Sequence, residues 1–118
     1  MATPSFGLPK LRSGESDDWD LWTDVNGSAQ IPSNAQAVTY NLTITQTEGA
    51  AFLAIIPAGG GWAGISNINW TARNVDLANG GTVGLGFSGA TGPGSCTVIC
   101  GGAGSATHYH NDITGYFI

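Results

Sequence analysis

The chain is short of charge, and positive charge is the scarcer sign. Its 118 residues include three Lys or Arg and eight Asp or Glu, so charged residues make up 9% of the sequence and the formal net charge is -5. Globular domains carry about 25% charged residues, so solubility here must rest on Ser, Thr, Asn and Gly, unless partners cover much of the surface. Lys10, Arg12 and Arg73 form no basic cluster. This argues against nucleic acid as a partner, because phosphate binding depends on clustered cations.

Long hydrophobic runs are also missing. No stretch of about 18 apolar residues is present, as a membrane-spanning helix would require, so we predict no membrane partner. Residues 1–10 lack the apolar core of a secretion signal. We therefore predict no targeting segment at this end of the sequence.

Sequence motifs of catalysis are absent as well. The chain contains no G-x-S-x-G nucleophile elbow, and Ser105 and His108 lack an orienting partner that the sequence would identify. The glycine runs 59–61 and 101–102 lack the Lys and Ser or Thr of a phosphate-binding loop. We predict neither an enzyme nor a bound cofactor.

Only two cysteines are present, at positions 96 and 100. On a regular strand they would lie about 13 Å apart, whereas a disulfide needs Cα atoms within about 7 Å, so a bond between them requires a bulge or a turn. Cys96, Val98 and Cys100 share one parity, which favours two buried thiols. A disulfide within the chain and one between subunits are the alternatives. The further ligands of a zinc site are missing.

The residues that are present follow a period of two. Residues 38–45 alternate strictly, with the apolar side chains on one face and Thr or Asn on the other. Residues 51–56 are apolar throughout, which indicates burial on both faces or an edge covered by a partner. Further strands are expected at residues 65–70, 82–87 and 96–100.

Turn residues separate these strands. Asn79, Gly80 and Gly81 predict a turn, after which Val83, Leu85 and Phe87 are expected to face the core. The last strand ends with Gly115-Tyr116-Phe117, and we expect its core packing to continue to the C-terminus. Six or seven short strands without a convincing amphipathic helix predict an all-β fold, an antiparallel β-sandwich of jelly-roll type with an extended N-terminal arm.

A change in composition near residues 25–30 divides the chain into an extended arm, 1–28, and a β-sandwich domain, 29–118. Pro4 and Pro9 favour an extended backbone in the arm. Residues 16–22 are compatible with a short helix, with Ser16 as its N-cap and two tryptophans on one side. These tryptophans either pack on the domain's own core or anchor the arm in a neighbouring subunit, where Trp is a favoured contact residue. In the second interpretation the partner-binding residues are Phe6, Leu8, Trp19, Leu21 and Trp22.

His108, His110 and Asp112 are weak candidates for a metal site. Their spacing of two places all three on one face of the last strand. Same-face neighbours on one strand lie nearly 7 Å apart, so closure around an ion would need ligands from elsewhere. We therefore predict no metal and interpret this face as a polar strand surface or a subunit contact.

Several short motifs from residue 32 onward resemble a β-sandwich surface module of actinobacterial cell-surface proteins and phage structural proteins. The opening residues 3–9 are also similar to the start of phage structural proteins. The motifs are Asn34-Ala35-x-Ala37-Val38, Phe52-Leu53, Pro57-Ala58-Gly59, Ser66-Asn67-x-Asn69-Trp70, Thr107-His108 and Asp112-x-x-Gly115-Tyr116-Phe117. In that module position 110 is usually apolar, so His110 departs from the pattern.

The resemblance implies a structural subunit on the surface of a virion, either a capsid decoration protein or a small tail or fibre protein. Its expected partners are other copies of itself, trimers being a natural form, and a major capsid or tail protein. The alternatives are a glycan-binding module on a cell surface and a subunit of an extracellular filament. For the glycan-binding alternative the candidate residues are Trp62, Asn67 and Tyr109.

Overall fold

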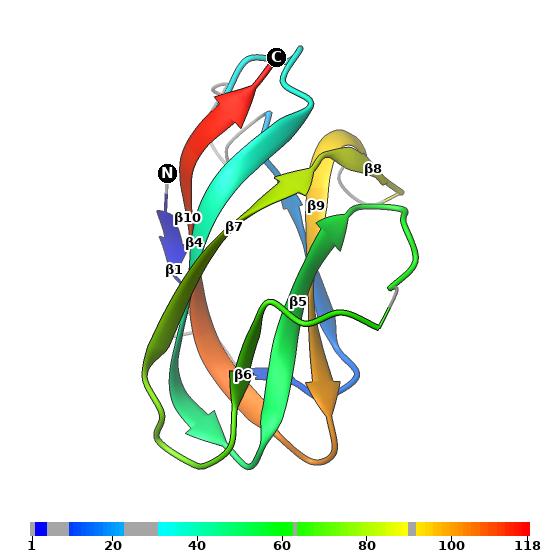
Figure 1. The fold of residues 1–118 in the computed structure, drawn as a ribbon. Coiled ribbons are helices and arrows are strands. Elements are labelled where there is room, and N and C mark those ends of the chain that lie inside the picture. The colour runs from blue at the N-terminus through cyan, green and yellow to red at the C-terminus, as the bar shows by residue number, and fades with distance from the viewer. Residues whose placement is uncertain (1, 5–9, 23–30, 63, 90–91) are drawn as a thin grey trace.

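The computed structural model describes residues 2–4, 10–22, 31–62, 64–89 and 92–118. They form ten strands in two antiparallel sheets that pack face to face (Figure 1). The predicted all-β sandwich is confirmed. In the described residues no helix is long and apolar enough to cross a membrane.

The first sheet is built around the C-terminal strand. Its strand order is β1 (Ala2–Pro4), β10 (Ala106–Phe117), β4 (Ala37–Glu48) and β7 (Leu77–Gly84). β2 (Leu11–Arg12) pairs with β10 at Ala106 and Thr107, next to the stretch that pairs with β1. The N-terminal strands therefore cover one edge of this sheet, and β7 forms the other edge.

The second sheet is built around β9 (Gly92–Gly102). Its strand order is β3 (Ser16–Asp20), β9, β5 (Ala51–Pro57) and β6 (Ile68–Trp70), and β8 (Gly86–Ser88) pairs with β9 beyond the end of β5. The N-terminal segment thus supplies an edge strand to this sheet too.

The core lies between the two sheets and follows the predicted alternation. In β4 the side chains of Val38, Tyr40, Leu42 and Ile44 are all buried in it. β5 is buried on both faces from Leu53 to Ile56, as its unbroken apolar run predicts. The hydrophobic effect acting on these alternating side chains positions the rest of the molecule.

Two predictions about the middle of the chain are wrong. Residues 79–81 form no turn; they lie inside β7, where a Cβ at Gly81 would come within 2.5 Å of the Tyr40 hydroxyl. Small residues are therefore needed where β7 passes over that ring. Phe87 does not face the core either, because the chain leaves the first sheet at Leu85 and joins the second as β8, which turns Phe87 outward.

The described part of the N-terminal segment is extended, and the short helix at residues 16–22 is wrong. Residues 16–20 form β3, whose five residues pair with Ser95 to Ile99 of β9. The hydrogen bonds of a sheet edge outweigh the weak helix signals of an N-cap and a first turn of acids. The boundary expected between residues 28 and 29 lies outside the described residues.

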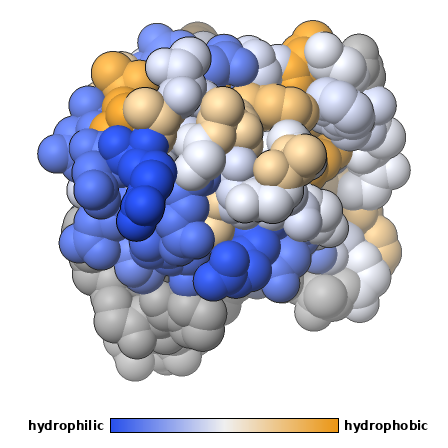
Figure 2. All heavy atoms as spheres, turned by 90° about the horizontal axis from the view of Figure 1, so that it is seen from below, coloured by the Kyte–Doolittle hydropathy of each residue, from blue (hydrophilic) through white to orange (hydrophobic). Residues whose placement is uncertain are grey.

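The end of the sandwich that carries the β4–β5 and β9–β10 turns is shown in Figure 2. Strongly hydrophilic residues gather on one side of this end, and weakly polar and apolar residues gather on the other.

Candidate functional site

The three metal-site candidates lie on the outer face of the first sheet. His108, His110 and Asp112 alternate with buried residues along β10, and their cross-strand neighbours in β4 are Thr45, Thr43 and Asn41. Within the described ranges, no three His, Cys, Asp or Glu side chains come together in a group that could hold a metal ion. The neighbouring strand offers these residues hydroxyl and amide groups.

The glycan candidates do not come together on one surface. Tyr109 points into the core, 2% exposed, because it lies on the opposite face of β10 from the histidines. Asn67 is occupied structurally: its Oδ1 accepts the Ile55 amide at 2.8 Å and its Nδ2 donates to the Tyr40 hydroxyl at 2.7 Å. Of the three candidates, only Trp62 has a ring that a ligand could reach. It is 49% exposed and stacks on Phe52, with ring centroids 5.5 Å apart.

The partner-binding candidates that the structure describes pack on the domain's own core. Leu21 is fully buried, and Trp19 and Trp22 are partly buried against the core cluster. This is the first of the two interpretations that the sequence allowed. Phe6 and Leu8 lie outside the described residues.

What fixes this segment is a chain of polar contacts from β3 to the first sheet. The Trp19 Nε1 donates to the Tyr109 hydroxyl at 2.9 Å, and that hydroxyl donates to Asp17 Oδ2 at 2.6 Å. Burial, followed by the adjacent Asp17 carboxylate, raises the pKa of Tyr109 far above its ordinary value of 10.0. The phenol therefore stays protonated and keeps its proton directed at the carboxylate.

A second acid holds the outer face of β3. Asp18 Oδ1 accepts the Thr97 hydroxyl at 2.6 Å, and its Oδ2 accepts the Ser88 hydroxyl at 2.8 Å. One carboxylate thus joins β3 to β9 and to β8. Hydrogen bonds to a charged acceptor are about twice as strong as neutral ones.

The chain crosses from the first sheet to the second at residues 13–15. Ser13 N donates to Ser105 O at 2.9 Å, and the Ser13 hydroxyl accepts the Ser105 amide at 3.1 Å. Gly14, at φ +88°, donates to Cys100 O, and the Cys100 amide donates to Glu15 O. The left-handed conformation at Gly14 suits glycine and makes this sharp corner between the sheets.

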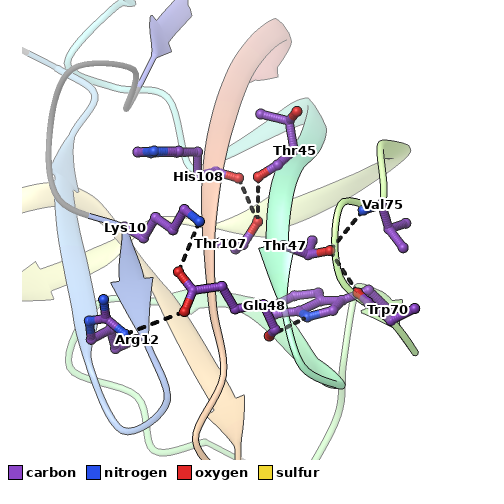
Figure 3. A network of polar contacts seen from close by, with 10 residues as sticks. Lys10, Arg12, Thr45, Thr47, Glu48, Trp70, Val75, Thr107 and His108 are labelled. Atoms are coloured by element: carbon purple, nitrogen blue, oxygen red, sulfur yellow. Dashed lines mark hydrogen bonds and ion pairs between the residues drawn. The ribbon is translucent and has the colours of Figure 1, made fainter.

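The segment is also held by ion pairs at the end of β4, drawn in Figure 3. Lys10 Nζ lies 2.9 Å from Glu48 Oε2, and Arg12 Nη1 lies 3.9 Å from Glu48 Oε1. The hydrogen bond from Lys10 and its charge hold the pKa of Glu48 below its ordinary value. Surface ion pairs add little stability, so these contacts contribute little to the free energy that holds the segment.

Next to Glu48, hydroxyl groups cap the same end of the sheet (Figure 3). The Thr47 hydroxyl accepts the Val75 amide at 2.9 Å and donates to Ala72 O at 2.8 Å. The Trp70 Nε1 lies 3.4 Å from Glu48 O. These bonds fix the loop of residues 71–76 to β4, just before β7 begins.

The two cysteines are free and buried behind β3. Burial is the main cause that raises the pKa of Cys96 to about 12 and that of Cys100 to about 11. Both remain thiols at neutral pH and act as small apolar residues. Of the three alternatives for Cys96 and Cys100, the structure shows two buried free thiols.

The C-terminal end is more exposed than the sequence analysis expected. Tyr116, Phe117 and Ile118 are 46%, 54% and 69% exposed, so core packing ends at Ile113. The backbone there is still held, since Phe117 O accepts the Gln36 amide at 2.8 Å and Phe117 pairs with Ala37. The strand projects past the opposite sheet.

Comparison of the chain with protein-family models, with curated proteins and with solved structures found no match. The sequence reasoning missed Asp17 and Asp18 as intramolecular contacts. The signal that would have found them is the alternation of Asp17, Trp19 and Leu21, which has a strand's period of two.

Proposed function

We propose that this chain is a structural subunit of a virion, a capsid decoration protein or a small tail or fibre protein. It packs against copies of itself and against a major capsid or tail protein on the particle surface. The observation that carries the proposal is the exposed apolar tip formed by Tyr116, Phe117 and Ile118 at the end of β10.

This tip is suited to burial by a protein partner. Its backbone is already fixed by pairing with β4, so a partner covers it without paying for much ordering of the chain. The whole chain carries 9% charged residues, and interface centres are depleted of charge and rich in aromatic side chains. Identical subunits that bury such tips form a closed ring, such as a trimer, when the rotation between neighbours closes.

Electron microscopy and mass measurement of the purified protein test this proposal. We expect oligomers or particle-like assemblies that Phe117→Ser weakens, because burying the exposed half of a Phe, roughly 100 Å², contributes about 2.5 kcal/mol to each contact. The control Thr82→Ser, at an exposed position of β7, should leave assembly unchanged. A wild-type protein that stays monomeric at high concentration contradicts the proposal, and open filaments favour the filament alternative.

A glycan-binding module is the second candidate, and the ring of Trp62 favours it. This ring is half exposed, its position is fixed by the stack on Phe52, and its Nε1 donates to Ile65 O at 2.7 Å. A rigid, exposed aromatic face suits the apolar face of a sugar ring. A polysaccharide pull-down with wild type and Trp62→Ala tests it. Absence of binding, or equal binding by both, excludes this site.

A further inference from the structure

Residues 10–22 form a separable insert in the sandwich. Between described residues, the hydrogen bonds from this segment to the side chains of Glu48, Ser88, Thr97 and Tyr109 and to the backbone of Gly94, Cys100 and Ser105 all reach partners at residue 48 or later. The side-chain contacts bridge sequence separations of 38 to 92 residues. Three short-range bonds lie within the segment and move with it: the Arg12 amide donates to Glu15 Oε1, the Glu15 amide donates to Arg12 O, and the Trp22 amide donates to Asp20 Oδ1.

The place of the segment in the sheets makes its removal simple. β1 and β2 both lie at the edge of β10, and β3 lies at the edge of β9, so only edge pairings have to separate when the segment leaves. What it leaves behind is incomplete, because Leu11 and Leu21 are 6% and 0% exposed and Trp19 packs against the core cluster. The sandwich therefore requires one such segment, and its contacts do not specify whether it belongs to the same molecule.

The fit of the segment is specific enough to select its own kind. The Trp22 ring lies against Gly94, where a Cβ would come within 2.2 Å of it. Asp17 and Asp18 each meet hydroxyl groups at defined places, on Tyr109 and on Ser88 and Thr97. A second copy of this chain presents the same residues in the same order.

We propose that residues 10–22 are exchanged between copies, so that β2 and β3 of one molecule complete the two sheets of the next. This inference rests on the proposed function and names the partner as a second copy of the chain. The eight residues 23–30 and their flanking peptide bonds reach at most about 30 Å when extended, so the two copies are direct neighbours. Domain swapping of this kind needs no new contact surface.

Concentration decides between the closed and the exchanged form. A molecule's own segment competes with a neighbour's for the same strand edges at an effective concentration of the order of millimolar. In dilute protein the segment therefore binds to its own molecule. Crowded copies on an assembling particle exceed that value locally. Contacts between residues far apart in the sequence also form slowly during folding, which leaves time for a neighbour's segment to dock first.

A cross-link between β3 and β9 distinguishes the two forms. Ser16 lies directly opposite Ile99 in the strand pair, and opposed Cα atoms in antiparallel strands lie about 4.5–5.5 Å apart, within the range of a disulfide. Both full-length variants carry Cys96→Ala and Cys100→Ala, which remove the two free thiols of the chain; one of them carries Ser16→Cys and the other Ile99→Cys. The two are unfolded, mixed, refolded at high concentration and oxidised. Because each chain carries only one of the two introduced cysteines, a disulfide between positions 16 and 99 forms only between copies.

We expect a covalent heterodimer on a non-reducing gel, with the bond mapped to positions 16 and 99 by mass spectrometry. Its yield should fall at least tenfold when refolding is done at one-hundredth of the concentration. The control pair of Ser16→Cys with Thr82→Cys, which lies at the opposite edge of the first sheet, should give none. The double variant Ser16→Cys/Ile99→Cys verifies the geometry, because it cross-links within one chain in dilute solution.

Failure of the exchange and failure of the proposed function give different results. If the double variant closes internally and the mixed pair never cross-links, while micrographs still show assemblies, the exchange is wrong and the subunit proposal stands. If the mixed pair cross-links but no closed oligomer or particle appears, the exchange stands and the virion role is wrong.

Discussion

Replacing Tyr109 by Phe removes a single hydroxyl group from the centre of the contact between β3 and the first sheet. The ring stays in place against Trp19, whose centroid lies 6.0 Å away. What is lost is the bond to the Asp17 carboxylate at 2.6 Å and the acceptor for the Trp19 Nε1 at 2.9 Å. The substitution therefore tests the polar contact separately from packing.

The size of the effect follows from these two bonds. A hydrogen bond to a charged group contributes about 1.5–3 kcal/mol, and an orphaned buried donor costs about 1–3 kcal/mol. Asp17 is exposed and Trp19 is partly exposed, so water compensates part of both losses. We expect the free energy of unfolding to fall by about 2 kcal/mol. With a urea m-value of about 2 kcal/mol/M, the midpoint falls by roughly 1 M.

Urea titration followed by tryptophan fluorescence measures this shift. Tyr116→Phe, at an exposed tyrosine, is the matched control and should change stability by less than about 0.5 kcal/mol. Asp17→Asn, alone and combined with Tyr109→Phe, completes a double-mutant cycle. Contacting residues are coupled by about 0.5–3 kcal/mol. An unchanged midpoint for Tyr109→Phe, or strict additivity in the cycle, refutes the role of the hydroxyl in holding β3.

Three further predictions concern the core. Leu21→Ala should cost about 2–5 kcal/mol in urea titration because Leu21 is fully buried, and a loss below 1 kcal/mol would place this residue elsewhere in solution. Gly81→Ala should lower the melting temperature, since its Cβ would lie 2.5 Å from the Tyr40 hydroxyl, whereas Gly61→Ala, with open space around it, should not. Both cysteines should resist a thiol reagent at pH 8 until urea is added. Their pKa values are raised from 9.0 to about 12 and about 11. The unfolded chain ionises them first, so stability should fall as pH rises from about 9 toward 12; rapid labelling of the native protein contradicts this.

The strands that could be predicted are those whose pattern is set by burial alone. Val38 to Ile44 alternate between the core and the outer face, and this pattern is sufficient to place β4. β3 could not be placed in the same way, because residues 16–22, with Ser16, three acids and two tryptophans, suit a helical turn as well as a strand. The free edge of β9 decides between them, and an edge is a property of the assembled sheet.

Glycines misled the sequence analysis for a related reason. Asn79-Gly80-Gly81 has the composition of a turn, but its small size is required where β7 passes over Tyr40. Phe87 points outward because the chain changes sheets at Leu85. The alternation of apolar residues continues through this crossing, so the sequence does not reveal it. Tyr109, by contrast, was predictable as buried: if His108 and His110 share the outer face, the residue between them points inward.

The corner at residues 13–15 has a mechanical consequence. There the chain passes from the first sheet to the second at the β10 side, and at Leu85 it passes between the sheets again at the β7 side. The two layers are thus linked covalently near both margins, and sliding one layer over the other must stretch a link. In an exchanged assembly the first of these links belongs to the neighbour. A pull on one copy is then carried into both layers of the next copy, so that lateral load is shared along the row of subunits.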